Sequence, residues 1–222
     1  MERKIVMLEV RDYSKPEMSA MFGTAGMQGL QRKMERYGIT FEVNGRGENA
    51  VFTIREIEDP FKIYCITELG FDGRTDFVKV RNFLHYFFND DEFMAMPDEV
   101  KEYRMRKQGQ DVSRQTIATY IAKLDSKNLI ERNTNDFIYY FALKQEQRIV
   151  EREEYLRAWH EYWNDIDNGF SSVDAIRRMQ RNYGGVARKQ AKPEINGIYT
   201  EQIEYLNTLV AQSIEKEIER QN

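Results

Sequence analysis

The run of side chains from Arg114 to Lys123 combines hydrogen-bond donors at a spacing that suits contacts with nucleic acid. Arginine and glutamine form paired hydrogen bonds with guanine and adenine edges in the major groove of DNA, while threonine and lysine reach phosphates or thymine methyl groups. The candidate contact residues in this run are Arg114, Gln115, Thr116, Thr119 and Lys123. A solvated helix face is the alternative interpretation, because most exposed charges have no specific partner.

The helix that would carry these residues is the clearest element in the sequence. Ser113 is a good N-cap, and Asn128 can adopt the left-handed conformation that ends a helix. The apolar residues recur at helical spacing and share one face, namely Ile117, Tyr120, Ile121 and Leu124. The five candidate contact residues lie outside this face, so we expect them to point away from the core.

The flanking elements predict a helix-turn-helix that is followed by a β-hairpin. A helix with a wide apolar face is expected over 77–89, and Pro97 with its acidic neighbours opens another helix. Apolar strands at 129–132 and 137–141 flank a turn at 133–136, which predicts a second hairpin, or wing.

The first 55 residues show the same order of elements. We expect a strand over 4–10 and a helix opened by Ser14, with Pro16 in its first turn and Glu17 in a capping box. The segment 23–26 contains two glycines and ends this helix. The following helix carries its apolar residues on one face: Met27, Leu30, Met34 and Tyr37.

The outward residues of this second helix, with the hairpin after it, form another candidate DNA contact. The outward donors are Gln28, Gln31 and Arg32. Strands at 41–43 and 50–54 flank an Asn-Gly turn, which is a strong hairpin signal, and Arg46 at the tip could enter a narrow minor groove. A flexible and solvated hairpin is the alternative.

The run from Val112 to Leu124, followed by Asn128-Leu129-Ile130, resembles the recognition helix and first wing strand of bacterial winged helix-turn-helix DNA-binding proteins. It is similar to those of transcription regulators and of plasmid and phage replication initiators. The resemblance covers residues 77–143, with a weaker one over 4–55, and Asn128 stands where the family often has glycine. It implies DNA binding as a class and leaves the biological process open.

These elements predict an α+β, predominantly helical chain with tandem winged helix-turn-helix units and a helical C-terminal region. The expected domains are an N-terminal winged unit, an acidic connector, a second winged unit and the helical region, at 1–57, 58–76, 77–144 and 145–222.

The C-terminal region shows helical patterns and no strand signals. Helices are expected over 146–166 and from a serine cap at 171 or 172 up to Tyr183. The apolar side of the first contains Ile149, Leu156, Trp159 and Trp163. A loop over 184–197 carries Arg188 and Lys189 as a candidate phosphate-binding arm, and an ordinary exposed loop is the alternative.

A final helix is expected from Thr200 onward, with an apolar stripe along it. The apolar residues recur every three or four positions: Ile203, Leu206, Val210, Ile214 and Ile218. The stripe could pack within its own chain or form a homodimer, and the paired half-sites that paired winged helices commonly read favour the dimer.

Charge is distributed unevenly along the chain. The sequence has 33 basic and 37 acidic residues and a formal net charge of −4, which argues against a protein that is basic throughout. Residues 101–128 nevertheless carry seven basic and three acidic side chains, a local balance of +4, whereas 56–100 carry four and eleven, a balance of −7. We therefore expect a polyanion to contact the basic segment locally.

Metal, cofactor and enzyme chemistry have no supporting pattern in the sequence. Cys65, His85 and His160 do not provide zinc-ligand spacing, and no nucleophile or phosphate-loop motif is present. We therefore expect no metal, no cofactor and no catalysis. The single cysteine and the lack of an apolar run long enough to span a bilayer predict a soluble, cytoplasmic protein without membrane contact.

The sequence thus predicts specific binding of double-stranded DNA, by a transcriptional regulator or by a replication initiator of a bacterial mobile element. Two winged units in one chain favour the initiator, and the lack of an enzymatic motif favours the regulator. The alternative is a protein-interaction module, such as a phage-encoded inhibitor that acts on a partner protein. The outward basic and glutamine side chains favour DNA, because a pure protein binder would not need them.

Overall fold

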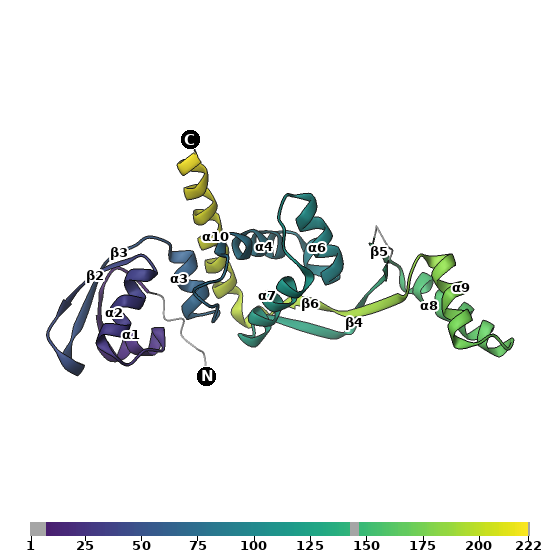
Figure 1. Ribbon diagram of the computed structural model, residues 1–222, viewed down its shortest axis with the longest axis horizontal. Coiled ribbons are helices and arrows are strands. Elements are labelled where there is room, and N and C mark those ends of the chain that lie inside the picture. The colour runs from purple at the N-terminus through teal and green to yellow at the C-terminus, as the bar shows by residue number, and fades with distance from the viewer. Residues whose placement is uncertain (1–7, 143–146, 222) are drawn as a thin grey trace. The chain divides into compact units, whose positions relative to one another are not determined.

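The computed structural model describes residues 8–142 and 147–221. It is an α+β chain with two small antiparallel sheets of three strands each (Figure 1). The chain divides into two compact units: unit 1 comprises the residues up to His85 together with the segment from Tyr199, and unit 2 runs from Tyr86 to Ile198. None of the described helices combines the length and the apolar character needed to cross a membrane.

Unit 1 begins with a small sheet and two helices packed against it (Figure 1). Its elements are β1 (Asp12–Ser14), α1 (Lys15–Phe22), α2 (Met27–Arg36), β2 (Ile39–Asn44), the 3-10 turn η1 (Gly47–Asn49) and β3 (Val51–Ile57). The strands lie in the order β1-β3-β2, and both pairs are antiparallel. The two helices and the hairpin predicted here are therefore confirmed.

The first strand lies later in the sequence than predicted. Residues 8–10 are not in a strand, and the remainder of the expected strand, 4–7, lies outside the described residues. The strand that the structure contains is β1, in which Tyr13 lies opposite Phe52 and is buried. The apolar run before residue 10 was misleading because pairing with β3, and not local strand propensity, decides which residues form the strand.

The core of unit 1 lies between the sheet and the helices α1 and α2. The predicted capping box of Ser14 and Glu17 starts α1, and Gly23 in a left-handed conformation ends it. The large buried side chains are Met18, Phe22, Leu30, Met34, Phe52 and Ile54. Each such side chain contributes roughly 1.5–3 kcal/mol when it leaves water, so this core fixes which face of α2 is exposed.

The segment expected as an acidic connector contains a helix of unit 1. α3 spans Pro60–Thr67, and its N-cap Asp59 accepts a hydrogen bond from the backbone amide of Lys62. Cys65 on this helix is fully buried. The net acidity of the segment concealed its short apolar run, because the acidic residues lie before and after the helix.

Two further helices belong wholly or partly to unit 1, namely α4 (Phe77–Asn89) and α10 (Thr200–Gln221). The helix α10 packs on α3, and the ring centroids of Tyr64 and Tyr205 are 5.7 Å apart. Arg81 of α4 donates a hydrogen bond to the carbonyl oxygen of Ser213 and forms an ion pair with Glu217, both on α10. Three residues of the predicted stripe are buried, namely Ile203, Leu206 and Val210, while Ile218 is exposed. Much of the stripe thus packs within the chain.

Unit 2 contains the helix that the sequence marks most clearly. After the end of α4 come α5 (Asp91–Ala95), α6 (Asp98–Lys107) and α7 (Arg114–Ser126). The hydroxyl group of Ser113 caps α7 by accepting a hydrogen bond from the amide of Thr116, and Asn128 has a positive φ of 58°, as predicted. The predicted apolar face is buried: Ile117, Tyr120, Ile121 and Leu124.

The hairpin predicted over 129–141 is wrong. The expected turn at 133–136 is part of one continuous strand, β4 (Ile130–Ala142), which pairs antiparallel with β6 (Ala187–Ile195) (Figure 1). The register of this pair shifts between Asn133 and Phe137. The asparagine-rich stretch therefore forms an irregularity in a strand, where a chain can absorb extra residues, and not a turn.

The loop predicted over 184–197 is also wrong, because most of it is β6. Arg188 and Lys189 lie in this strand, opposite Tyr140 and Tyr139 of β4. Lysine and proline are poor strand formers, so nothing local predicts a strand here. β6 is an edge strand, in which Pro193 is tolerated, and pairing with β4 overrides the local preference.

The expectation that the C-terminal region lacks strands fails at a second place. Gln147–Val150 form β5, which pairs with β4, and the helix α8 spans Arg152–Asp167. Residues 143–146 lie outside the described residues. Ile149, expected on the apolar side of a helix, is instead on an edge strand and exposed. The next helix, α9 (Ser172–Tyr183), begins at its predicted cap, Ser171.

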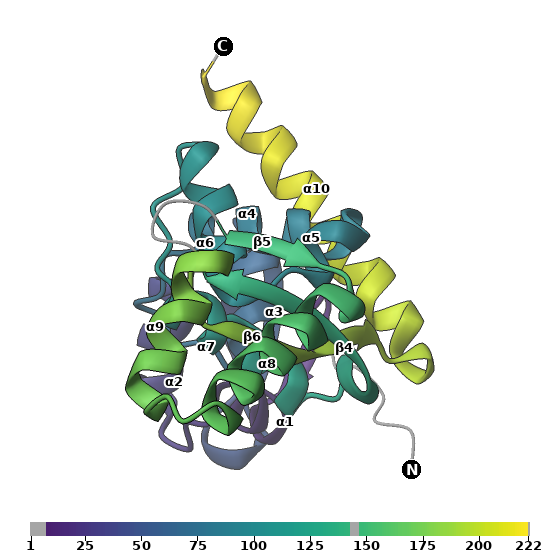
Figure 2. The same cartoon turned by 90° about the vertical axis from the view of Figure 1, so that its right-hand side faces the viewer.

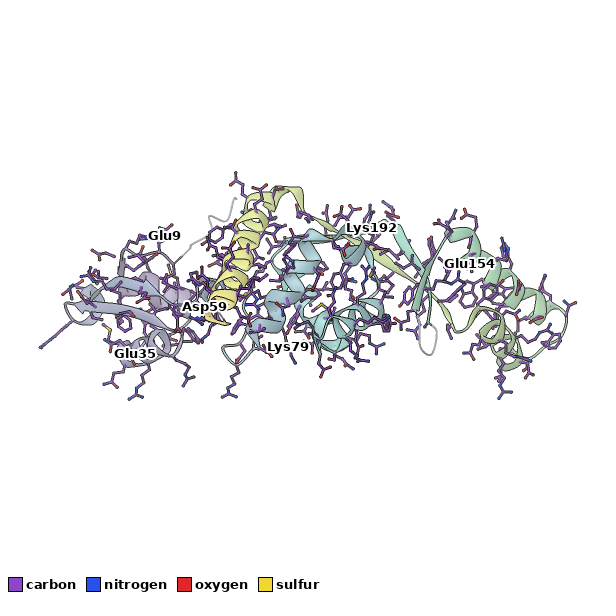
Figure 3. The ribbon with its side chains drawn as sticks, turned by 90° about the horizontal axis from the view of Figure 1, so that it is seen from above. Glu9, Glu35, Asp59, Lys79, Glu154 and Lys192 are labelled. Carbon is purple, nitrogen blue, oxygen red and sulfur yellow. The ribbon has the colours of Figure 1, made fainter. Side chains whose placement is uncertain are left out.

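The helices α8 and α9 pack together at the end of the ribbon formed by β4 and β6 (Figures 1 and 2). In Figure 3, Lys192 marks β6 and Glu154 marks the first turn of α8. The core at this end is small and consists of Phe141, Val150, Ala158, Met179 and Ala187. Gly185 lets the chain return along β4, since a Cβ atom at this position would lie 1.6 Å from the carbonyl oxygen of Ala142.

A fully buried lysine lies in unit 2. The amino group of Lys101 on α6 donates a hydrogen bond to the carbonyl oxygen of Met96 and lies 3.7 Å from Asp98. Burial lowers the pKa of Lys101 to about 8, while Asp98 partly opposes the change. The folded chain therefore releases this proton at a lower pH than the unfolded chain does.

We expect the free energy of unfolding of unit 2 to rise between about pH 8 and pH 10 because of Lys101. In this interval the unfolded chain retains a proton that the folded chain has lost, whereas below it both retain the proton. The full difference between pKa values of about 8 and 10.5 corresponds to roughly 3 kcal/mol. Denaturant unfolding followed by tryptophan fluorescence measures it, because Trp159 and Trp163 are the only tryptophans in the chain. The rise should be absent in Lys101→Met, and equal pH dependence in both proteins would contradict this assignment.

Candidate nucleic-acid interface

The turn between α1 and α2 is held by a lysine that sequence reasoning did not identify. The amino group of Lys33 donates a 2.6 Å hydrogen bond to the carbonyl oxygen of Phe22, at the C-terminal end of α1. Carbonyl groups in the last turn of a helix lack intrahelical partners. Lys33 therefore satisfies one of them and fixes the end of α1 against α2.

The exposed face of α2 carries the donors predicted for unit 1. Gln28 and Arg32 are exposed and Gln31 is half-buried. Among the described residues, none forms an ion pair or a side-chain hydrogen bond with Gln28, Gln31 or Arg32. These three side chains are thus available to an external ligand without the loss of a side-chain hydrogen bond or an ion pair.

The tip of the β2–β3 hairpin presents a further arginine in unit 1. Gly45 and Gly47 on either side of Arg46 have positive φ values of 88° and 64°. An ion pair between the largely buried Lys15 of α1 and Glu48 ties the tip to the helix. Arg46 itself is exposed and has no ion-pair partner in the part of the chain that the structure describes. The hairpin is therefore anchored beside its free arginine.

In unit 2 the exposed face of α7 is organised by local hydrogen bonds. The hydroxyl group of Thr119 donates a 2.9 Å hydrogen bond to the carbonyl oxygen of Gln115, and the hydroxyl groups of Thr116 and Ser113 are 2.9 Å apart. Gln115 and Thr119 are exposed, while Thr116 and Lys123 are half-buried. Gln115, Thr116, Thr119 and Lys123 therefore share one surface of α7, but two hydroxyl groups already have partners.

Glu99 holds the arginine at the start of α7. The carboxylate of Glu99 on α6 accepts a 3.0 Å hydrogen bond from Arg114 and a 3.1 Å hydrogen bond from the hydroxyl group of Tyr140 on β4. Burial, followed by the charge of Glu99 and this hydrogen bond, raises the pKa of Tyr140 to about 12. Glu99 thus connects three elements of unit 2, and any anion that binds Arg114 must compete with it.

Carboxylates also neutralise other cations in the basic segment 101–128. Arg104 lies 3.3 Å from Asp90 and 3.4 Å from Glu92, and Arg106 lies 2.7 Å from Glu102. Because Lys101 is buried and Arg114 is paired, the balance of +4 overstates the charge that this surface presents.

The two basic residues predicted for a flexible arm lie instead on a paired strand. Arg188 and Lys189 are neighbours in β6, so their side chains point to opposite faces of the ribbon. The amino group of Lys189 lies 4.6 Å from the ring centroid of Phe137. Both residues are exposed, but they cannot act as one phosphate-binding arm.

The structure brings the predicted residues together in two separate sets. In unit 1 the helix α2 and the hairpin with Arg46 belong to one compact body. In unit 2 Arg188 lies opposite Tyr140 in the pairing of β6 with β4, and Tyr140 and Arg114 of α7 both contact Glu99. Sequence reasoning missed Glu99 and Lys33 as organising residues. The acidic start of α6 was visible in the sequence, but its pairing with Arg114 depends on tertiary contacts.

Comparisons with known proteins found no match to this chain among family models, curated proteins or solved structures.

We expect Lys33→Met to loosen the α1–α2 turn. Loss of a charged hydrogen bond to a backbone carbonyl group that is partly exposed should cost roughly 1 kcal/mol. Hydrogen exchange of the amides in α1 and α2 measures the effect locally. Arg36→Met on the same helix is the matched control, since Arg36 has no ion-pair partner among the described residues. Equal exchange in both variants would contradict the role of Lys33.

Proposed function

We propose that the protein binds double-stranded DNA in a sequence-specific manner through tandem helix-turn-helix units of the winged type, with α2 and α7 as recognition helices. In unit 1, two helices joined by a short turn precede a hairpin, and the sheet order β1-β3-β2 supports the winged assignment. In unit 2, the pair α6 and α7 precedes the ribbon of β4 and β6, which takes the place of a local wing. An exposed helix can enter the major groove while a β-ribbon contacts the backbone or the minor groove.

The observation that carries the proposal is a set of hydrogen-bond donors in unit 1 that form no ion pair or side-chain hydrogen bond with the described residues. Gln28, Gln31 and Arg32 on one helix face and Arg46 on the anchored hairpin have the hydrogen-bonding groups that read base edges and narrow minor grooves. Arginine and glutamine in this arrangement give up no internal ion pair or side-chain hydrogen bond on binding. We therefore assign the principal DNA contact to unit 1.

Unit 2 would contribute a contact that depends on Glu99. A base or a phosphate that binds Arg114 competes with the carboxylate of Glu99, whereas Gln115 and Thr119 are accessible without such competition. The contribution of α7 to affinity is therefore expected to be smaller than that of α2.

Two biological roles fit a chain with two DNA-contacting units: a transcriptional regulator, or a replication initiator of a bacterial mobile element. An initiator opens its origin, while a regulator only occupies its site. Reactivity of unpaired thymines in the bound duplex distinguishes the two.

A protein-interaction module is the alternative function. The neutralised cations of α6 and α7 favour it for unit 2, because such a surface attracts a polyanion weakly. Failure to select any duplex from a randomised library would support this alternative.

We expect Arg32→Ala and Arg46→Ala to weaken DNA binding in different ways. With a duplex selected from a randomised library, Arg32→Ala should cost about 1–3 kcal/mol and relax the preference at one base pair, as for a base-reading contact. Arg46→Ala should reduce the slope of the logarithm of affinity against the logarithm of salt concentration by about one, as expected for the loss of one phosphate contact. Arg74→Ala is the control, because Arg74 is also exposed in unit 1 but lies outside α2 and the hairpin. Unchanged affinity in both test variants would exclude unit 1 as the contact.

We expect Glu99→Gln to strengthen DNA binding, because Arg114 loses its competing carboxylate. Titration of the selected duplex at two salt concentrations measures the change. Glu102→Gln, which removes a carboxylate paired with Arg106 on the same helix, is the matched control. The gain should disappear in the double variant Glu99→Gln with Arg114→Ala, and a gain that persists there would show that Arg114 is not the responsible group.

A further inference from the structure

The hairpin of α8 and α9 exposes large apolar side chains that its small core does not use. Trp163 on α8 is 56% exposed, Val173 on α9 is 56% exposed, and Phe170 in the turn between the helices is 42% exposed. Figure 1 shows these two helices at the end of the ribbon of β4 and β6, where they pack against each other. Several exposed large apolar residues on one small element commonly mark an interaction surface.

The exposed residues follow helical spacing and so form one row on each helix. On α8 the spacing of three and four residues places one exposed set in a row: Glu153, Leu156, His160, Trp163 and Asp167. On α9 a spacing of four residues aligns a second exposed set: Val173, Arg177 and Arg181. The opposite side of the hairpin packs on β4 and β6 through Ala158 and Met179. These two exposed rows, which we call the face of α8 and α9, combine apolar residues in each helix with charges that differ between the helices.

The two helices carry opposite charge. α8 contains two basic and five acidic residues, whereas α9 contains three basic residues and one acidic residue. Within the chain this charge is only partly matched, through Arg178 and Asp165 at 3.2 Å and through Arg177 and Asp174 at 3.5 Å. Arg181 has no ion-pair partner among the described residues. An acidic helix beside a basic helix is complementary to a second copy of itself when the copy is turned by a two-fold axis.

We propose that the face of α8 and α9 binds the same face of a second copy of this chain and forms a two-fold symmetric four-helix contact. In such an isologous interface α8 of one copy lies against α9 of the other, so both acidic helices meet basic ones. Trp163, Phe170 and Val173 supply its apolar contacts, and large aromatic side chains commonly dominate binding energy in such interfaces. This inference does not depend on DNA binding.

The expected dimer is weak. By the rise of an α-helix, α8 and α9 are roughly 24 and 18 Å long. Two short helices from each copy make a small interface, and interfaces that bury less than ~1,200 Å² are commonly weak or transient. The monomer and dimer should therefore exchange at micromolar concentrations.

The proposed surface differs from the homodimer surface expected at residues 200–222. In the first half of that stripe, Ile203, Leu206 and Val210 are buried within unit 1. Ile218 is left exposed and provides a direct test of the α10 surface.

Sedimentation velocity of the full chain over a concentration series tests the proposal. The parent should convert from monomer to dimer as concentration rises, and Trp163→Glu should remain monomeric at the concentrations where the parent is dimeric. Ile198→Glu is the matched control, because Ile198 is 80% exposed in the same unit but outside the hairpin. Circular dichroism confirms that each variant is folded. A parent that stays monomeric throughout, a dimer that survives Trp163→Glu, or a dimer lost in Ile218→Glu but not in Trp163→Glu would overturn the proposal.

Charge reversal tests the arrangement of the helices independently of the tryptophan. One variant carries Glu153→Lys with Asp167→Lys, and the other carries Arg177→Glu with Arg181→Glu. Each alone should be monomeric, because α8 and α9 would then have like charges across the two-fold axis. An equimolar mixture should form a heterodimer, because each reversed helix meets a helix of opposite charge. No recovery in the mixture of two folded variants would overturn the two-fold arrangement.

Discussion

The pairing of β4 with β6 is the contact on which unit 2 depends. It joins segments that are far apart in the sequence, and closing the intervening chain costs conformational entropy that the strand hydrogen bonds and the burial of Phe141 and Ala187 offset. Arg188 lies opposite Tyr140 only because of this register. The chain between β5 and β6 forms α8 and α9, and these two helices lie at the end of the same ribbon. The close approach at Gly185 makes the return along β4 sterically feasible.

The electrostatic character of the two units follows from where carboxylates fold, and not from the charge of each segment. The acidic segment 56–100 supplies Asp90, Glu92 and Glu99, and these pair with arginines of the basic segment 101–128. The two segments that looked like opposite features of the sequence therefore neutralise each other in part. In unit 1, by contrast, Arg32 keeps its charge available. This difference is why the proposed function gives α2 the larger role, although the sequence pattern of α7 is the clearer of the two.

DNA binding and self-association would use different surfaces of the chain, and each would strengthen the other. A dimer through α8 and α9 would present two copies of each DNA-contacting unit, so that binding of the first raises the effective concentration of the second. Weak self-association and modest affinity at each unit could then give selective binding to paired half-sites. Such a dimer needs no contribution from the apolar stripe of α10, much of which packs within unit 1.

The sequence by itself determined the elements whose signals are local. The capping box at Ser14, the cap at Ser113, the buried face of α7 and the left-handed Asn128 follow from interactions within a few residues, and all are present. Tertiary structure alone decided the strands of unit 2 and the charge of its surface. A strand such as β6 has no local stabilisation and forms only where β4 offers its backbone groups, and a cation such as Arg114 is neutralised only where the fold brings Glu99 beside it. Local patterns report interactions close in sequence, whereas pairing of strands and of charges depends on distances in space.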